Sequence, residues 1–426
     1  MIILYNILIS VLFILISPYI FFKLLIPATR SEWIERLGFW KYQLDSMPGK
    51  NIWIHCASVG ETKLAGLLIQ KLHASYSGKL KFFLSVITPA GKKFASEQKL
   101  PVEKLFYLPF DLPFLIKKTV KSIKPDLLIL VETELWPNLI HSCSKSAKLK
   151  ILIVNSRISD KSINSYLLFK WFFKHVLNKV ELFLVREHID RKRLLSLGVP
   201  ENKIHITGNM KYDLTGNTLF SAQEISKIKS ELFLPPAVKL FTAGSIRAGE
   251  EKFVLSGYLK LKSIIPDLKL IFAPRHMNRI NFIKDLLNTN RLKFACKSQL
   301  SEFSGDYDVC ILDTFGELLK IYAISGVCFV GGTLIPVGGQ NMLEPVMVNK
   351  LPLFGQYTGS FKEPAELLKS AGIGIEIKSI DELVEKSVYL ITNPEFIKEK
   401  IPVCSKIIEQ MKGATDRNIS IITRYL

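Results

Sequence analysis

Acidic residues are scarce in this sequence. Its 426 residues include 38 aspartates and glutamates against 57 lysines and arginines, which gives a formal net charge of +19. An excess of this size favours a negatively charged partner, and nucleic acid, anionic lipid and a phosphorylated substrate are the candidates. Because the RNP1, zinc-finger and KH signatures are missing, we expect no nucleic acid among the partners.

Cysteine and metal-binding patterns are also sparse. None of the six cysteines belongs to a C-x-x-C pair, and several lie within apolar runs, which is typical of buried, reduced thiols. The sequence has no H-E-x-x-H motif and no Cys/His cluster. The D-x-D sequence Asp306-Tyr307-Asp308 precedes an expected strand instead of following one. We therefore expect no metal and no cofactor.

Charge is nearly absent from residues 1–26, where Lys23 is the only charged side chain. About 20 apolar residues suffice to cross the core of a bilayer. No positive charge precedes the run and no A-x-A site follows it, which argues against a cleaved signal peptide. Because Arg30, Arg36 and Lys41 follow the run, we predict a retained membrane anchor with the short N-terminus outside and the remaining chain in the cytoplasm. A deeply interfacial helix is the alternative.

Short apolar runs alternate with amphipathic stretches beyond this segment, and such alternation predicts parallel sheets covered by helices. In the first half the expected strands are Ile52–Cys56, Lys81–Val86, Leu127–Val131, Lys150–Asn155 and Leu182–Arg186. After Pro235-Pro236 the rhythm restarts, with expected strands at Lys239–Ala243, Leu268–Ala273, Val309–Leu312, Gly326–Val330 and Leu351–Phe354. Two successive parallel α/β domains with a hinge would form a ligand-binding cleft.

These patterns predict the organisation of the chain. We expect a membrane anchor at residues 1–26, a first domain at 27–210, a linker at 211–236 and a second domain at 237–410. The remaining residues, 411–426, should form a C-terminal helix that could pack back on the first domain.

The most informative stretch is glycine-rich and spans residues 329–355. A strand ends at Gly331-Gly332, a second pair follows at Gly338-Gly339, and Asn341 to Pro345 opens a helix with Glu344 in its first turn. Such glycines let backbone N–H groups approach an anion, and a helix N-terminus adds positive potential. Glu344 could accept hydrogen bonds from two sugar hydroxyls, which suits a nucleotide-sugar. With no G-x-G-x-x-G and no G-K-[ST] ending, an ordinary α/β turn is the alternative.

A second group of polar residues follows the first strand. Ser58 and Gly60 make a tight turn, and Glu61 then begins a helix. A carboxylate in this place could take a proton from an attacking hydroxyl, which is typically worth about 10²–10⁴ in rate. The alternative is that Glu61 only complements the helix dipole.

Further polar residues end other strands. Glu132 follows the strand Leu127–Val131, Arg157 follows another, and Lys211 lies at the domain crossover. Each could instead be hydrogen-bonded scaffold.

In the second half, Ser245 and Arg247 follow a strand and precede a helix, where Ser245 and free N–H groups would hold a phosphate. Arg275 follows the next strand and suits bidentate binding of phosphate or carboxylate.

Taken in order, these motifs resemble one family along nearly the entire chain. They are HCASVGET (55–62), TPAG (88–91), YLPFDLP (107–113), ETELWPNL (132–139), NSRIS (155–159), GNMKYD (208–213), GSIRAGEE (244–251), PRH (274–276), DTFGEL (313–318) and GGTLIPVGGQNMLEP (331–345). The series is similar to that of the 3-deoxy-D-manno-octulosonic acid (Kdo) transferases, which serve lipopolysaccharide synthesis in Gram-negative bacteria. The resemblance implies an α/β GT-B fold, with two Rossmann-like domains facing across a cleft.

The resemblance also implies a reaction. The donor would be CMP-Kdo, the acceptor a lipid A precursor (lipid IVA) in the inner membrane, and the transfer a direct displacement that inverts the anomeric centre. By motif matching, Glu61 would be the general base. Ser245, Arg275, Asn341 and Glu344 would surround CMP, with Glu344 on the ribose.

Other residues enter the implied site from the chemistry of their side chains. For Glu132, Arg157 and Lys211 the resemblance implies positions in the cleft, and only their roles are inferred from chemistry. The chain departs from the family pattern at two places, with Ile246-Arg247 where Thr-His is common and Gln340 where a histidine is common. Gln340 cannot carry a proton, while Arg247 could add phosphate or Kdo-carboxylate binding.

The basic balance would then serve an anionic membrane leaflet, where each nearby lysine or arginine contributes about 1 kcal/mol. Residues 166–174 interleave aromatic, apolar and lysine side chains, and we expect them to dock on anionic inner-membrane lipids near the acyl chains. A buried helix with a charged edge is the alternative. Two other functions are a GT-B enzyme that uses a UDP-sugar and a non-catalytic, anchored protein that holds phosphorylated lipid.

Overall fold

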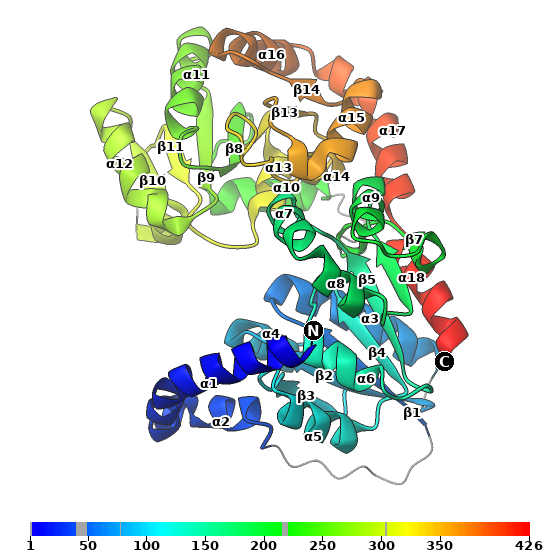
Figure 1. Ribbon diagram of the computed structural model, residues 1–426. Coiled ribbons are helices and arrows are strands. Elements are labelled where there is room, and N and C mark those ends of the chain that lie inside the picture. Colours follow the sequence, from blue (N-terminus) through cyan, green and yellow to red (C-terminus); the bar gives the residue numbers. More distant parts are fainter. Residues whose placement is uncertain (1, 40–48, 77, 215–219, 303–304) are drawn as a thin grey trace. The chain divides into compact units, whose positions relative to one another are not determined.

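The computed structural model describes residues 2–39, 49–76, 78–214, 220–302 and 305–426 (Figure 1). The chain divides into two compact units. The first comprises Met1–Thr215 with Met411–Leu426, and the second comprises Gly216–Gln410. Lys41 and residues 215–219 of the expected linker lie outside the described residues.

A parallel sheet of seven strands, in the order β3-β2-β1-β4-β5-β6-β7, forms the centre of the first unit. The strands are β1 (Lys50–Cys56), β2 (Leu80–Val86), β3 (Lys104–Tyr107), β4 (Leu127–Val131), β5 (Lys150–Ser156), β6 (Leu182–Val185) and β7 (Ile204–Ile206). The five expected strands are present within one or two residues at each end. The short edge strands β3 and β7 were not expected, because three or four residues make no distinct apolar run.

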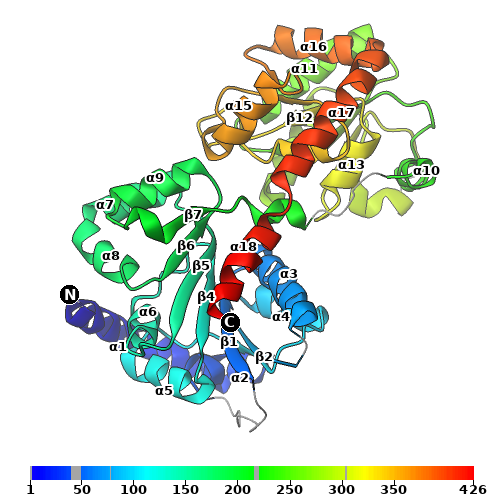
Figure 2. The same cartoon turned by 90° about the vertical axis from the view of Figure 1, so that its right-hand side faces the viewer.

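Helices cover both faces of this sheet (Figure 2). They are α1 (Ile2–Leu25), α2 (Pro27–Arg36), α3 (Val59–Ser75), α4 (Pro89–Glu97), α5 (Pro113–Ile123), α6 (Pro137–Cys143), α7 (Asp160–Leu168), α8 (Lys170–Leu177), α9 (His188–Ser196) and α18 (Ala414–Ile422). One core packs Trp53 and alternate strand residues against α5, α6 and α8. The other packs Ile52 and Ile54 against α3 and α18.

The C-terminal helix α18 is held on the first unit by Asp213. The Asp213 carboxylate accepts hydrogen bonds from the backbone N–H groups of Gly413 and Thr415, each at 2.6 Å, at the start of α18. Ile422 near the helix end is buried in the core beside α3. These bonds satisfy N–H groups that a helix N-terminus otherwise leaves without an acceptor.

The second unit has its own parallel sheet of seven strands, in the order β10-β11-β9-β8-β12-β13-β14. The strands are β8 (Leu240–Ile246), β9 (Lys269–Pro274), β10 (Phe294–Cys296), β11 (Val309–Ile311), β12 (Val327–Val330), β13 (Pro352–Phe354) and β14 (Ile375–Glu376). The sequence did not indicate β10 and β14, which are again short strands at the edges.

The helices of this unit are α10 (Ala222–Glu231), α11 (Glu251–Ile264), α12 (Ile280–Thr289), α13 (Leu318–Ile324), α14 (Leu343–Met347), α15 (Lys362–Ser370), α16 (Ile380–Thr392) and α17 (Pro394–Met411). Helix α10 lies within the stretch that was expected to be a linker. A capping box of Ser221 and Glu224 starts it, and Ile228 packs in the core of the unit.

Each sheet contains a divergence point, at which strands that come later in the chain lie on both sides of the unit's first strand. In the first unit β1 lies between β2 and β4, and in the second β8 lies between β9 and β12. Loops that leave the carboxyl ends of the two central strands diverge there, and such points are where open α/β sheets bind ligands. The topology therefore directs attention to the residues after β1 and β4, and to those after β8 and β12.

Helix α1 lies along the surface of the first unit (Figure 1). Its rings contact the unit at Tyr5, which is 5.9 Å from Phe172, and at Phe13, which is 5.4 Å from Phe110. The Tyr5 hydroxyl also donates a 2.9 Å hydrogen bond to Asp111. The opposite face of the helix is apolar and exposed, and among the described residues α1 alone is long and apolar enough to cross a membrane.

Candidate active site

Three glutamates meet at the carboxyl edge of the first sheet. Glu61 follows β1, while Glu132 and Glu134 follow β4, so both sides of the divergence point contribute. The negative charges of Glu132 and Glu134 both act on the Glu61 carboxyl. We call Glu61, Glu132 and Glu134 the acidic cluster. The sequence grouped these residues only by their positions after strands, and the sheet order brings them together.

Glu61 is the third residue of α3 and part of a capping box. The Ser58 hydroxyl donates to Glu61 Oε1 at 3.1 Å and accepts from the Glu61 N–H, while Glu61 Oε2 accepts from the N–H of Ala57. Burial raises the pKa of the Glu61 carboxyl, the Ala57 N–H opposes this, and the charges of Glu134 and Glu132 raise the pKa further. The cap explains why a glutamate is placed here, but it does not explain the neighbouring carboxylates.

Gly60 precedes Glu61 on the exposed side of α3. A side chain added there would find its nearest neighbour, Ser58 Oγ, at 3.9 Å. No packing contact of the described residues therefore requires glycine at this position.

Glu132 has the opposite electrostatic environment. Its Oε1 accepts a hydrogen bond from Arg186 and lies 2.8 Å from Lys211 Nζ. Burial acts to raise the pKa of Glu132, but the positive charges of Arg186, Lys211 and Arg157 outweigh it and lower the pKa. Glu132 is thus held ionised and is a weak base. Arg186 was taken only as the end of a strand, and sequence offered no signal for its pairing with a residue 54 positions away.

Glu134 is positioned by aromatic side chains. The Trp136 indole N–H donates to Glu134 Oε2 at 2.9 Å, and Nε2 of the fully buried His55 lies 3.7 Å from the same oxygen. Nδ1 of His55 contacts Ser85 Oγ at 2.9 Å. Within the described residues His55 Nε2 has no hydrogen-bond partner, and its 3.7 Å approach to Glu134 directs this edge of the ring toward the acidic cluster. His55 was present in the HCASVGET motif, but the sequence assigned it no role.

In the second unit, the candidate donor residues lie at the carboxyl edge of the sheet. Ser245 is the second-last residue of β8, Arg247 follows β8, Arg275 follows β9, and Glu344 lies in the first turn of α14 with Asn341 just before it. We call Ser245, Arg247, Arg275, Asn341 and Glu344 the arginine cluster. The expected helix opening at Glu344 is confirmed, although α14 has only five residues.

Contacts within the arginine cluster link several of its side chains. The Asn341 amide donates to Glu344 Oε1 at 3.4 Å. Burial raises the pKa of Glu344, against the lowering effects of Asn341 and of the Arg275 charge. Arg247 Nη1 lies 3.3 Å from His276 Nε2, and its buried Nε has no hydrogen-bond partner among the described residues. Two guanidinium groups at the edge of this sheet would bind an anionic ligand.

The glycine-rich loop differs in one respect from expectation. The buried Glu250 carboxylate accepts hydrogen bonds from the N–H groups of Gly332, Thr333 and Leu334 at 2.6–3.0 Å, and from that of Arg247 at 2.9 Å. These N–H groups were expected to be available to an anionic ligand, and that expectation is wrong for Gly332–Leu334. The Glu250 carboxylate therefore accepts the hydrogen bonds that an anionic ligand was expected to accept.

Gly338 and Gly339 are explained by backbone packing. Both adopt a positive φ, +91° and +82°, which side chains disfavour. A Cβ at Gly338 would lie 2.4 Å from Ser360 Oγ, and one at Gly339 would lie 3.3 Å from the Tyr357 carbonyl oxygen. The structure thus needs glycine at both positions whether or not a ligand binds there.

Possible metal ligands do not gather in the part of the chain that the structure describes, where no group of three His, Cys, Asp or Glu side chains could hold an ion. In the D-x-D sequence, Asp306 pairs with Lys269 and Asp308 with Lys262.

Comparisons with known proteins agree with this arrangement. A family model described as 3-Deoxy-D-manno-octulosonic-acid transferase (kdotransferase) matches residues 31–214. A 3-deoxy-D-manno-octulosonic acid transferase of Haemophilus influenzae is 31% identical over 402 residues, which cover 94% of this chain and 92% of that protein. A bifunctional glycosyltransferase/methyltransferase of Fusobacterium nucleatum is 36% identical over 358 residues, or 82% of this chain. The match spans only 54% of that longer protein.

A solved structure supports the fold. The glycosyltransferase from Rickettsia africae matches with a TM-score of 0.64 over 88% of this chain and 98% of its own, at 13% identity. The fold and these relatives define a glycosyltransferase with two Rossmann-like domains of the GT-B type. The chain belongs to the 3-deoxy-D-manno-octulosonic acid (Kdo) transferase family.

The role of Glu250 can be tested by hydrogen exchange. Glu250→Gln removes the charge that holds three consecutive N–H groups. A hydrogen bond to a charged group is typically worth about 1.5–3 kcal/mol. We therefore expect the amide hydrogens of Gly332–Leu334 to exchange at least about tenfold faster in Glu250→Gln than in the wild type. Glu251→Gln is the matched control, since Glu251 pairs with Arg279 and the Gly249 N–H instead. Equal exchange in the two variants would contradict the proposed role of Glu250.

Proposed function

We propose that the protein transfers Kdo from CMP-Kdo to a lipid A precursor, lipid IVA, at the inner membrane. Membership of the Kdo transferase family supports the choice of donor and acceptor. The observation that carries the mechanism is the acidic cluster, in which burial and two neighbouring carboxylates raise the pKa of Glu61, while a Cβ added at the adjacent Gly60 would meet no atom closer than 3.9 Å. A base with a raised pKa accepts a proton more readily near neutral pH.

The proposed reaction is one direct displacement with inversion. An acceptor hydroxyl oxygen attacks the anomeric carbon of Kdo and its proton passes to the Glu61 carboxylate. The bond between that carbon and the phosphate oxygen breaks, and CMP leaves with the electron pair. Arg247 and Arg275 would stabilise the charge that develops on the leaving phosphate.

The remaining candidate residues have supporting roles in this proposal. Ser245 would bind the phosphate, and Asn341 would orient Glu344 toward the ribose hydroxyls. Lys211 and Arg157, which both act on Glu132, would hold the anionic groups of the acceptor. Gly338 and Gly339 would contribute loop shape, since their backbone conformation leaves them little alternative.

Membrane association is the second part of the proposal. Leu168 at the end of α7, Phe169 between the helices and Trp171 in α8 are exposed by 74%, 51% and 51%, which argues against the alternative of a buried helix. Exposed apolar groups of this size mark interaction surfaces. Trp171 contacts Phe172, whose ring contacts Tyr5 of α1, so α1 adjoins this surface. Contacts along α1 favour the interfacial arrangement, with the helix embedded beside the first unit.

The first test is a transfer assay with CMP-Kdo and a tetra-acylated lipid A precursor, with products read by mass. We expect Glu61→Gln to lower the rate about 10²–10⁴-fold, because the general base is lost. Glu97→Gln, an exposed glutamate of the same unit, should keep the wild-type rate. The mass increments give the number of Kdo residues added.

Each outcome of this assay separates the alternatives. Equal rates for wild type and Glu61→Gln would remove Glu61 as the base while keeping the transferase. Inhibition by UDP and not by CMP would favour a UDP-sugar enzyme. Binding of the lipid without any product would favour the non-catalytic protein.

The pH dependence tests the environment of Glu61. The base acts when it is deprotonated, so the rate should fall as the pH drops through its pKa, which lies above the ordinary glutamate value of about 4.3. Glu134→Gln removes one of the charges that raise this pKa and should move the acid limb of the kcat/KM profile to lower pH. Glu97→Gln should leave the limb in place. An unmoved limb in Glu134→Gln would contradict the coupling of the two carboxyls.

Membrane docking can be tested by charge reversal on α5, which begins just after Phe110 and Asp111, where α1 contacts the unit, and carries the exposed residues Phe114, Lys117, Lys118 and Lys121. Because each lysine near an anionic surface contributes about 1 kcal/mol, changing all three lysines to glutamate should weaken binding to phosphatidylglycerol vesicles at least tenfold. Lys320, Lys362 and Lys406 of the second unit, changed in the same way, control for net charge. Equal loss in both triple variants would point to net charge and not to a docking face.

A further inference from the structure

A cavity of about 490 Å³ lies in the second unit at the amino-terminal edge of its sheet. Lys239 directly precedes β8, Gly326 directly precedes β12, and Lys350 lies just before β13. The arginine cluster follows the carboxyl ends of strands in the same sheet. The cavity is therefore separate from every residue assigned above to Kdo transfer.

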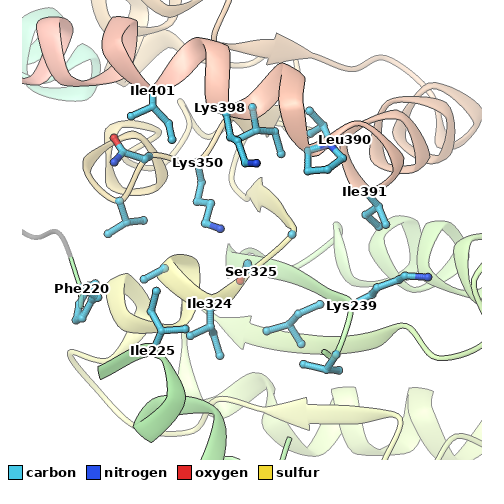
Figure 3. A pocket seen from close by; sticks show the side chains of 18 residues that line it. Phe220, Ile225, Lys239, Ile324, Ser325, Lys350, Leu390, Ile391, Lys398 and Ile401 are labelled. Carbon is cyan, nitrogen blue, oxygen red and sulfur yellow. The ribbon is translucent and has the colours of Figure 1, made fainter. Parts of the chain in front are cut away.

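The walls of the cavity are mainly apolar. Ile225 of α10, Ile324 of α13, Leu390 of α16 and Ile401 of α17 approach it from four helices (Figure 3). The only charged side chains among its described lining residues are three lysines, and no carboxylate is among them. Sites for small molecules usually have volumes of about 300–1,000 Å³ and apolar walls with a few polar groups, which matches this cavity.

Lys350 differs from the other two lysines. Figure 3 shows its amino group directed into the cavity, and the hydrogen bonds and ion pairs of the described residues include none to its Nζ. Lys239 instead lies 3.6 Å from Asp267, and Lys398 donates to Glu395 at 2.7 Å. Burial lowers the pKa of Lys350, Cys328 opposes this, and the charge of Lys229 lowers the pKa further.

A half-buried ammonium group without an anion is costly, because it has lost part of its hydration and gained no counter-charge. A ligand with a carboxylate or phosphate would supply that counter-charge. A small inorganic anion would leave the apolar walls uncovered, and a neutral chain would leave Lys350 unpaired. A ligand that satisfies both features has an anionic head and one apolar chain.

We propose that this cavity binds a single-chain amphiphile whose anionic head pairs with Lys350 and whose chain lies between α10, α13 and α17. The cavity is bordered by Phe220, near the start of the second unit, and by Ile397 and Ile401 of α17, the helix through which the chain leaves it. A bound chain would hold α17 against α13. Pro402 interrupts the backbone hydrogen bonding of α17 beside this contact.

Photo-crosslinking of the full-length protein locates such a site directly. The probe is dodecanoate with a diazirine at the chain end, irradiated with the protein in a neutral detergent, followed by peptide mapping. We expect saturable labelling of peptides that contain residues 323–326 and 390–401. Peptides of α1 provide an internal reference, because its exposed apolar face should take up probe without saturation.

Two variants and one control define the result. Lys350→Met keeps the aliphatic stem and should lower labelling of the cavity peptides at least tenfold, while Lys239→Met should leave it unchanged. Gly326→Leu narrows the cavity beside Ile391 but keeps the charge, and it should lower the same labelling at least tenfold. A Cβ at Gly326 meets no atom closer than 3.5 Å, so this variant is expected to fold.

Competition identifies the head group. Unlabelled dodecanoate or dodecyl phosphate should displace the probe, and the stronger competitor distinguishes a carboxylate from a phosphate ligand. Equal displacement by dodecyltrimethylammonium, equal labelling of Lys350→Met and wild type, or labelling confined to α1 would each overturn the proposal. Transfer activity with CMP-Kdo is measured on the same preparations and should be unchanged in Lys350→Met, so the two proposals can fail independently.

Discussion

The structure depends on one constraint, which is that every strand of both sheets runs parallel to its neighbours. Parallel strands place all their carboxyl ends at one edge, and there the central strands β1 and β8 send their loops away from those of β4 and β12. Because helices cover both faces, the strands are almost wholly apolar and their polar neighbours must follow them. The acidic cluster and the arginine cluster are therefore both products of strand polarity. Any polar residue that directly follows a central strand therefore lies at the carboxyl edge of its sheet.

Within this frame, charge partners decide what each carboxylate can do. Glu132 is paired with Arg186 and Lys211 and is held ionised, whereas Glu61 has hydrogen-bond donors but no paired cation among the described residues, and it has a raised pKa. Glu250 is buried and satisfied by four backbone N–H groups, so it serves the loop and not a substrate. One residue type thus supplies a scaffold, an electrostatic anchor and a candidate base. The difference lies in which donors and cations surround each carboxyl group.

The two units also differ in how they present apolar side chains. The first unit exposes the outer face of α1 together with Leu168, Phe169 and Trp171, whereas the second unit has an apolar cavity beside Lys350. The first arrangement suits an extended lipid surface, and the second suits one chain. Both are accompanied by lysines, so the two proposals would give the excess of basic residues two distinct physical uses. A family enzyme that acts on lipid would meet both kinds of ligand in its surroundings.

The sequence by itself determined the buried strands, because runs such as Leu127–Val131 can only be satisfied in the interior, and it placed Glu61, Glu132, Ser245 and Arg275 at strand ends. It could not indicate β3, β7, β10 or β14, which are too short to show a period. Only the tertiary structure decided that Glu132 pairs with Arg186, that Glu250 takes the N–H groups of Gly332–Leu334, and that Lys350 faces a cavity. The reason is that a run of apolar residues indicates burial by itself. The partners of a charged side chain instead depend on which strands are neighbours in the sheet, and they come from residues far apart in the chain.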